Sequence, residues 1–152
     1  MRTILLACLI IFITPVCLAQ VGTVKPQDPV EEKIWKLEDA YFSNLYKANY
    51  PGVLALVHER FLGWPAGLPK PVDKPESSRF MKQLVPRPSK CRFRIEREGI
   101  RLLGAIALTQ YIIYVDCPDS SGIDKKTSSR ITHTWVKEGL RWKLLGGMSG
   151  EK

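Results

Sequence analysis

The spacing of apolar residues changes at Lys90, and this change constrains the fold more than any other feature of the sequence. Before Lys90, apolar residues recur at steps of three and four, which is typical of amphipathic helices. After it, Cys91, Phe93 and Ile95 alternate with charged side chains, which is typical of a strand with one face in water. A chain that passes once from helices to strands predicts an α+β fold, with N-terminal helices packed on an antiparallel sheet.

The first helix is predicted to begin after Asp28. Asp28 suits the N-cap, Pro29 suits the first helical position, and Glu31 can reach back to the backbone of the cap. The apolar stripe of this helix is broad and rich in rings, and consists of Val30, Ile34, Trp35, Leu37, Tyr41, Phe42, Leu45, Tyr46 and Ala48. The charged residues are expected mostly off this stripe, and they are Glu31, Glu32, Lys36 and Glu38. A stripe of this width predicts that the helix covers a broad surface, which we interpret as a sheet.

Two shorter helices are predicted on either side of a segment rich in Gly and Pro. One covers residues 53–59 and the other covers residues 76–84. Between these helices, Trp64 stands between Gly63 and Pro65, in a stretch that we expect to form neither a helix nor a regular strand.

The predicted sheet is curved and bulged and has three to four strands. The first strand begins at Lys90, and its apolar register slips at Gly99, which predicts a β-bulge near that glycine. A tight turn at Leu103 and Gly104 joins it to the next strand. The remaining strands are predicted over residues 105–115, 130–136 and 141–147, with a polar loop over 118–129.

Residues 1–19 are predicted to be a cleaved secretory signal. A basic start is followed by an unbroken apolar run over 4–13, and small residues stand where a signal peptidase cleaves. The alternative, an uncleaved membrane anchor, needs about 20 apolar residues, and Pro15 interrupts this run. We therefore expect a secreted or periplasmic protein without a stable membrane anchor after cleavage, with a flexible leader over 20–27 and one domain over 28–149.

The formal net charge of +8 raises the question of nucleic acid as a partner. Lys and Arg are scattered along the chain rather than massed on one helix, which favours a solvated basic face, so we expect no nucleic acid partner. The sequence has no phosphate-binding loop and no Ser-His-Asp spacing. After signal cleavage it keeps two cysteines and two histidines that are far apart, so we expect neither a metal site nor a cofactor.

Cys91 and Cys117 are the cysteines left after signal cleavage, in a compartment where disulfides persist. With a two-residue turn at Leu103 and Gly104 and one bulge, Cys91 faces Val115, and Cys117 is its diagonal neighbour. The Cβ atoms of the two cysteines would then be ~7 Å apart, whereas a disulfide needs about 3.8 Å. A turn longer by one residue would bring them closer, so a disulfide and two buried thiols both remain open.

Four short blocks of sequence occur in an order that resembles a known family. They are Trp35-x-x-Glu38, Phe61-Leu62-Gly63-Trp64-Pro65, Leu103-Gly104-Ala105-Ile106-Ala107, and Thr132-x-x-Trp135 followed by Trp142-Lys143-Leu144. Over about residues 28–149, the chain resembles the SnoaL-like members of the nuclear transport factor 2-like superfamily, in particular the domain of unknown function 4440 group. This resemblance implies a cone, in which a strongly curved sheet wraps around the long helix and a pocket opens at the wide end.

Aromatic residues of these blocks, of the long helix and of the first strand are candidates to line the pocket. These candidates are Trp35, Tyr41, Phe61, Trp64, Phe93 and Trp135. A cavity lined by rings suits a small, partly hydrophobic molecule. We expect Trp64 at the mouth of the cone, where its indole either lies at the rim or plugs the opening.

The resemblance also raises the question of catalysis, because ketosteroid isomerase has this fold. That enzyme uses an Asp base and an oxyanion hole formed by a Tyr and a protonated Asp. Here residues 61–65 contain no acid at the expected place of the base, and the apolar inner face of the first strand offers no second acid, so that mechanism is not expected. His133, which alternates with Ile131 and Trp135, and Tyr41 remain weak catalytic candidates. A purely structural role of His133 is the alternative.

Three functions therefore remain open from the sequence. The first is a pocket that binds a small, partly hydrophobic molecule without catalysis. The second is an enzyme of the isomerase or polyketide cyclase type that uses His133 with Tyr41. The third is a structural or dimerisation module, since cones of this kind often dimerise through the outer face of the sheet. The wet positions Lys90, Arg92 and Arg94 place any homodimer patch on other strands.

Overall fold

The computed structural model describes residues 28–118 and 123–152. The predicted signal over 1–19 and the leader over 20–27 lie outside the described residues. The described elements are, in chain order, α1 (Pro29–Tyr46), α2 (Tyr50–Leu56), β1 (Val57–Trp64), β2 (Val72–Asp73), α3 (Lys74–Leu84), β3 (Arg92–Leu103), β4 (Ile106–Pro118), β5 (Asp124–Glu138) and β6 (Arg141–Glu151).

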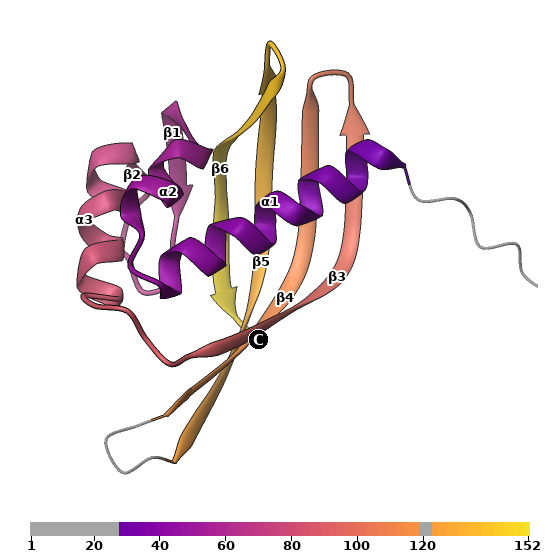
Figure 1. Ribbon diagram of the computed structural model, residues 1–152. Coiled ribbons are helices and arrows are strands. Elements are labelled where there is room, and N and C mark those ends of the chain that lie inside the picture. Colours follow the sequence, from indigo (N-terminus) through magenta and orange to yellow (C-terminus); the bar gives the residue numbers. More distant parts are fainter. Residues whose placement is uncertain (1–27, 119–122) are drawn as a thin grey trace, which may run out of the picture.

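The strands form one curved sheet, and the helices lie on one of its faces (Figure 1). The order of the strands is β2-β1-β6-β5-β4-β3, and every neighbouring pair is antiparallel except β1 and β6, which run parallel. Helix α1 begins near the β3 edge and crosses the sheet toward β1, while α2 and α3 lie beside β1. The predicted α+β fold, with N-terminal helices packed on a curved, bulged antiparallel sheet, is confirmed.

Helix α1 begins as its sequence predicts. The side chain of Asp28 accepts a hydrogen bond from the backbone N–H of Val30 at 2.7 Å, and Pro29 occupies the first turn. The buried residues of α1 are Ile34, Trp35, Glu38, Phe42 and Leu45. The expectation that Glu38 lies mostly off the buried stripe was therefore wrong, and this correction defines the site below.

The segment after α2 differs from the prediction. The predicted helix over 53–59 ends already at Leu56, because the chain then becomes extended and pairs with β6. Strand β1 includes Trp64, so the expectation of no regular strand was wrong at the start of this stretch, whereas residues 65–71 form neither a helix nor a strand, as predicted. The cause is tertiary, because Gly146 of β6 lies so close to β1 that a Cβ there would be 2.2 Å from the carbonyl oxygen of Leu62.

The hairpin between β3 and β4 contains the predicted bulge but turns one residue later than predicted. The register shifts between Arg97 and Gly99, which confirms the bulge. Leu103 pairs with Ile106, so the turn consists of residues 104 and 105. A turn that is displaced by one residue moves the pairing by two, and this places Cys91 opposite Cys117, one pair beyond Arg92 and Asp116.

The predicted polar loop over 118–129 was largely wrong, because β4 continues to Pro118 and β5 already begins at Asp124. The side chains of this part of β5 are polar and give no apolar alternation. Backbone pairing to the end of β4, from Thr127 opposite Val115 to Asp124 opposite Pro118, keeps the segment extended.

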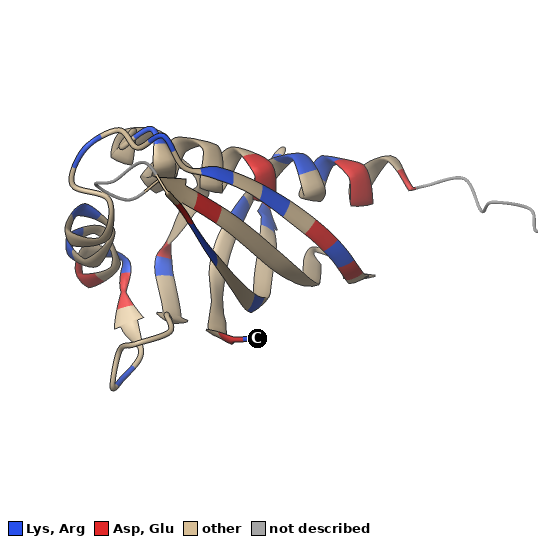
Figure 2. Ribbon diagram, turned by 90° about the horizontal axis from the view of Figure 1, so that it is seen from below, with Lys and Arg blue, Asp and Glu red and all other residues tan. Residues whose placement is uncertain are grey.

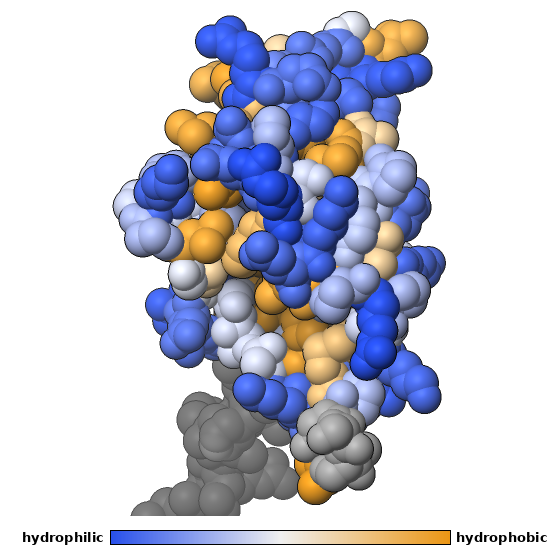
Figure 3. All heavy atoms as spheres, turned by 90° about the vertical axis from the view of Figure 1, so that its left-hand side faces the viewer, coloured by the Kyte–Doolittle hydropathy of each residue, from blue (hydrophilic) through white to orange (hydrophobic). Residues whose placement is uncertain are grey.

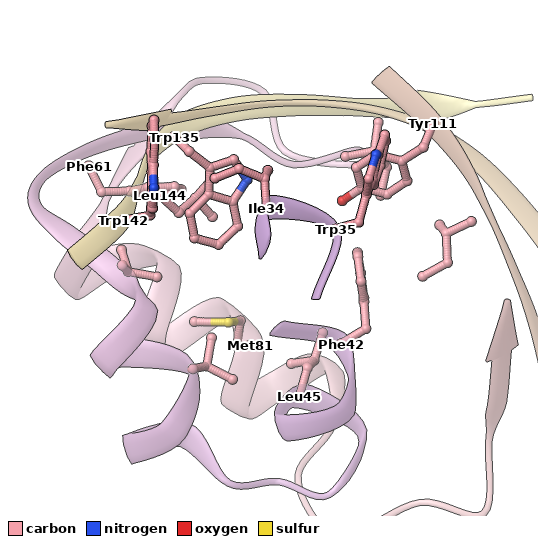
Figure 4. Packing of buried hydrophobic residues seen from close by; sticks show 14 of the residues in the cluster. Ile34, Trp35, Phe42, Leu45, Phe61, Met81, Tyr111, Trp135, Trp142 and Leu144 are labelled. Atoms are coloured by element: carbon pink, nitrogen blue, oxygen red, sulfur yellow. The ribbon is translucent and has the colours of Figure 1, made fainter. Parts of the chain in front are cut away.

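The hydrophobic core lies between the concave face of the sheet and the helices (Figure 4). Trp35 and Phe42 of α1 both pack edge-on against the ring of Tyr111 of β4, with ring centroids 6.0 and 6.3 Å apart. Ile34, Trp135 and Leu144 are fully buried in the same core. These contacts fix α1 across the sheet and so position the side chains of the site.

Candidate functional site

A cavity of about 320 Å³ lies between α1, α3 and the strands β1, β4, β5 and β6. This volume is at the lower end of the range for small-molecule pockets, about 300–1,000 Å³. Its wall is mostly apolar and aromatic, and includes Tyr41, Phe42, Phe61, Trp64, Phe80, Met81, Ile113 and Ile131. His133 lies among these residues and brings an imidazole ring into the wall, and the other polar lining residues are Ser77, Thr127, Ser129 and Ser149.

The mouth of the cavity is formed by apolar side chains that reach the surface. Trp64 is 44% exposed at the end of β1, and Met148 of β6 and Leu84 of α3 are exposed beside it in the lining. Figure 3 shows the α3 side of the molecule, where apolar atoms are visible between hydrophilic ones. The indole N–H of Trp64 donates to the carbonyl oxygen of Leu68 at 2.8 Å, so Trp64 is held at the rim by strand β1 and by this bond.

His133 belongs to a group of hydrogen-bonded side chains around the buried Glu38, which we call the Glu38 cluster. It consists of Glu38, Thr109, Tyr111, His133 and Trp135. Oε1 of Glu38 accepts from the hydroxyl of Thr109 and the indole N–H of Trp135, both at 2.7 Å. Oε2 accepts from the hydroxyl of Tyr111 and from Nδ1 of His133, both at 2.8 Å.

These bonds define Glu38 as a carboxylate. The hydroxyls of Thr109 and Tyr111 and the indole N–H of Trp135 all donate to Glu38, which suits the lone pairs of an ionised carboxyl group. Burial alone would raise the pKa of Glu38, but the charge of His133 and hydrogen bonds from His133, Thr109 and Trp135 outweigh burial and hold this pKa below its usual value. The fully buried carboxylate is thus stabilised by its partners rather than by water.

Tyr41 of α1 stands next to His133, with ring centroids 5.6 Å apart and the rings nearly perpendicular. Its hydroxyl lies 3.7 Å from the thioether sulfur of Met81, which is a weak acceptor. Burial and then the negative charge of Glu38 raise the pKa of Tyr41, so the phenol stays neutral and can donate to a ligand. The structure therefore brings together the two residues that were the catalytic candidates of the sequence.

Of the six predicted pocket residues, Tyr41, Phe61 and Trp64 line the cavity. The other three face the core instead of the cavity, and each has a different neighbour. Trp35 packs between Tyr111 and the guanidinium of Arg97. Phe93 packs against Phe42 and Tyr46, and Trp135 is fully buried and bonded to Glu38.

Glu38 is the site residue that the sequence reasoning missed. It lies four residues after Ile34 and four before Phe42, so it shares their face of the helix. The expectation that the inner face offers no acid considered the strands, whereas this acid comes from the helix. A charge at an inward position of an otherwise apolar stripe was the signal available.

Cys91 and Cys117 form a disulfide with their Cα atoms 4.2 Å apart, and this bond joins the start of β3 to the end of β4. Val115, two residues before Cys117, lines the cavity. The disulfide therefore joins the two strands covalently near the cavity wall.

Within the described residues, no three His, Cys, Asp or Glu side chains gather closely enough to hold a metal ion. None of the helices in residues 28–118 and 123–152 is both long and apolar enough to cross a membrane. Lys and Arg are spread over several elements and interleaved with Asp and Glu, as Figure 2 shows.

The curved sheet and the crossing helix form a nuclear transport factor 2-like fold, as in solved structures described as nuclear transport factor 2-like or ketosteroid isomerase-like. The chain belongs to the calcium/calmodulin dependent protein kinase II association domain family, whose model matches residues 30–147. The fold that the resemblance implied is thus confirmed, but the matching family is not specifically the SnoaL-like group. No curated protein matches the sequence.

Several solved structures share the fold at low sequence identity. A putative calcium/calmodulin dependent protein kinase II association domain from Xanthomonas campestris is 18% identical, with a TM-score of 0.72, and the match covers 84% of this chain and 91% of that one. The association domain of the kinase from C. elegans is 14% identical, with a TM-score of 0.73 and coverage of 80% and 95%. A nuclear transport factor 2-like superfamily protein from Salmonella enterica is 13% identical, with a TM-score of 0.68 and coverage of 80% and 90%.

Proposed function

We propose that the cavity binds a small, partly apolar molecule that carries one polar group. The observation that carries this proposal is the imidazole of His133, which lies in a mostly apolar wall and whose Nδ1 is bonded to the buried carboxylate of Glu38. An apolar pocket with a few convergent polar groups is typical of a small-molecule site. The apolar part of the ligand would contact the rings, and its polar group would meet His133 and Tyr41.

A pair of neighbouring serines on β5 tests this proposal. Ser129 lines the cavity, whereas Ser128 lies on the other face of the strand, opposite Tyr114. We expect Ser129→Phe to fill the cavity and abolish binding of an apolar fluorescent dye, while Ser128→Phe leaves it unchanged. Equal dye binding by both folded variants would overturn the proposal. Native mass spectrometry of protein purified from its own host would then identify a ligand that co-purifies.

A second candidate function is self-association, and a separate observation favours it. The similar structures include an association domain from C. elegans and a kinase hub from S. rosetta. On the outer face of this sheet, Ile106 and Leu108 of β4 and Leu62 of β1 are exposed. Such apolar side chains suit contact with a second copy of the chain, at least as a homodimer.

The oligomeric state tests this second function directly. We expect Leu108→Lys to reduce the mass of the particle in sedimentation analysis, because a charge would enter the apolar contact. Leu140→Lys is the matched control, since Leu140 is 88% exposed at the turn between β5 and β6 and away from that face. A monomeric wild-type protein would overturn the association function.

We also propose that the protein works outside the cytoplasm, in a secreted or periplasmic location. The disulfide between Cys91 and Cys117 supports this proposal, because such bonds persist in oxidising compartments. Fractionation of the host cells with an antibody to the protein tests it, and a purely cytoplasmic signal would overturn it.

A further inference from the structure

The Glu38 cluster fixes which nitrogen of His133 carries a proton. Both oxygens of Glu38 are acceptors, so Nδ1 of His133 must donate its proton to Oε2 at 2.8 Å. In the neutral ring Nε2 is then the basic nitrogen. Among the described residues, no hydrogen bond to Nε2 accompanies those to Nδ1, and the ring lines the cavity. Nε2 is therefore the atom of His133 that a ligand can engage.

The strand beside His133 is shaped to leave room for this ring. A Cβ at position 147 would lie 2.6 Å from Cδ2 of His133, the carbon bonded to Nε2. Gly147 of β6 therefore leaves the space that this ring edge occupies, and the same Cβ would also lie 2.2 Å from the carbonyl oxygen of Thr132. The opposite ring edge is occupied by Glu38 and Tyr111, so the orientation of the ring is fixed on both sides.

We propose that His133, supported by Glu38, accepts the proton of a weakly acidic hydroxyl on a small planar ligand, such as a phenol or an enol. This inference rests on the proposed binding function of the cavity. The O–H bond of the ligand breaks, its electron pair stays on the oxygen, and a new N–H bond forms at Nε2 of His133. The resulting imidazolium lies between two negative groups, the ligand oxygen and the carboxylate of Glu38, and Tyr41 donates to the ligand oxygen.

The composition of the wall favours a ligand that enters neutral. The residues that line the described cavity include no Lys, Arg, Asp or Glu, so a permanent anion such as a carboxylate would meet no fixed positive charge. A phenol or enol crosses the apolar mouth without charge and becomes an anion only beside His133. The transfer leaves the net charge of the site unchanged, because the proton moves from the ligand to the ring. The aromatic walls formed by Tyr41, Phe61 and Trp64 also suit a planar ring.

A nitrophenol tests the inference, because its neutral and ionised forms absorb at different wavelengths. The full-length protein is titrated at a fixed pH below the pKa of the free phenol, and binding is measured independently by calorimetry. We expect the ratio of phenolate to phenol to rise about tenfold on binding to the wild-type protein. In His133→Asn the amide can still donate to Glu38 but has no basic nitrogen, so we expect binding without ionisation. His58→Asn is the matched control, because His58 pairs with Glu138 on β5 and lies outside this cavity.

The outcomes separate this inference from the binding function. Ionisation in the wild type and in His58→Asn, together with its loss in His133→Asn, supports proton acceptance by His133. Binding of nitrophenol without ionisation, or ionisation that persists in His133→Asn, would overturn the inference and leave the binding function intact. Failure of both nitrophenol and the apolar dye to bind the folded protein would overturn both.

Discussion

The inner end of the cavity is supported by buried polar side chains, whereas its mouth consists of exposed apolar side chains. Behind the inner wall, the Glu38 cluster is buried, and no buried side-chain polar atom of the described residues lacks a hydrogen-bond partner. At the mouth, Trp64 and Met148 expose large apolar surfaces to water. Each buried polar atom of the cluster has a partner, at the cost of burying a charge, whereas the mouth exposes apolar surface to water.

We infer from this difference that the cluster stabilises the fold, whereas the mouth contributes to the binding of a ligand. A buried charge whose partners all come from the protein makes each partner costly to remove. An exposed apolar rim gains its contacts only when a ligand covers it. Substitutions in the cluster should therefore change the free energy of unfolding, and substitutions at the mouth should change affinity.

Removal of the buried carboxylate should have the largest effect on stability. Glu38→Ala leaves four buried donors without their acceptor, and we expect the free energy of unfolding to fall by about 3–5 kcal/mol. Urea denaturation measures this change. Glu31→Ala is the control, since Glu31 is a half-buried acid in the first turn of the same helix and its loss should cost only a small part of that amount. A Glu38→Ala protein as stable as the control would show that the cluster does not hold the fold.

Acidic pH should remove the stabilisation that the carboxylate of Glu38 provides. The pKa of Glu38 is lower in the folded protein than its usual value of 4.5, so its stabilisation is complete above pH 4.5 and is lost as the pH falls through the lower folded pKa. We expect the stability of the wild type to decline below pH 4.5 more steeply than that of Glu38→Gln, which has no carboxyl group to protonate. Denaturation curves at a series of acidic pH values measure the slopes. Equal slopes of stability against pH in the two proteins would show that groups other than Glu38 cause the loss of stability in acid.

Removal of the disulfide between β3 and β4 should have the next largest effect on the free energy of unfolding. The bond closes a loop with a sequence separation of 26 residues, so the double variant Cys91→Ala and Cys117→Ala should lose about 2–4 kcal/mol of stability. Urea denaturation of the variant and of the reduced wild type measures this loss. If the wild type instead carried free thiols, alkylation without a reductant would label both cysteines and a reductant would not change its stability.

The fold was largely predictable from the sequence because its signals are local. The period of α1, its cap at Asp28 and the bulge at Gly99 each depend on neighbouring residues. Strand β1 was missed because its pairing with β6 joins residues far apart in the chain, and residues 61–64 alone have no strand pattern. The pairing of Cys91 with Cys117 stayed open because one residue in the turn decides it.

The site was predictable only in part for the same reason. The pairing of Tyr41 with His133 followed from their places on the inner faces of the helix and the sheet. Glu38 was not found, since its partners Thr109 and Trp135 lie 71 and 97 residues further along the chain. A charged residue on a helix is normally assigned to water, and only the tertiary structure shows the donors that replace it.

Substitution at the mouth should change affinity much more than stability. Trp64→Ala removes a half-exposed ring from the rim, so we expect the affinity for an apolar dye to fall about tenfold. The melting temperature should stay within about 5 °C of the wild type. Leu140→Ala is the control, because this residue is exposed far from the rim and should change neither property. A large loss of stability would instead make Trp64 a core residue that closes the cone.

The smallest effect on stability is expected at Tyr41, where the two ends of the cavity meet. Within residues 28–118 and 123–152 its hydroxyl makes one hydrogen bond, a weak one to the sulfur of Met81 at 3.7 Å, so Tyr41→Phe should change the free energy of unfolding by less than about 1 kcal/mol. The hydroxyl of Tyr50 is a useful contrast, because it donates to the carbonyl oxygen of Val85 and ties α2 to the end of α3. Tyr50→Phe should therefore lower stability more than Tyr41→Phe does, and should leave binding unchanged.

Binding of a ligand that carries a hydroxyl group should reverse this ranking. If the hydroxyl of Tyr41 is kept free for a ligand, Tyr41→Phe should weaken nitrophenol several-fold and leave nitrobenzene, which lacks the hydroxyl, unaffected. Calorimetric titration of both compounds into both variants measures the difference. An equal loss of affinity for the two compounds would show that Tyr41 contributes only its ring, and the polar contact of the cavity would then rest on His133 alone.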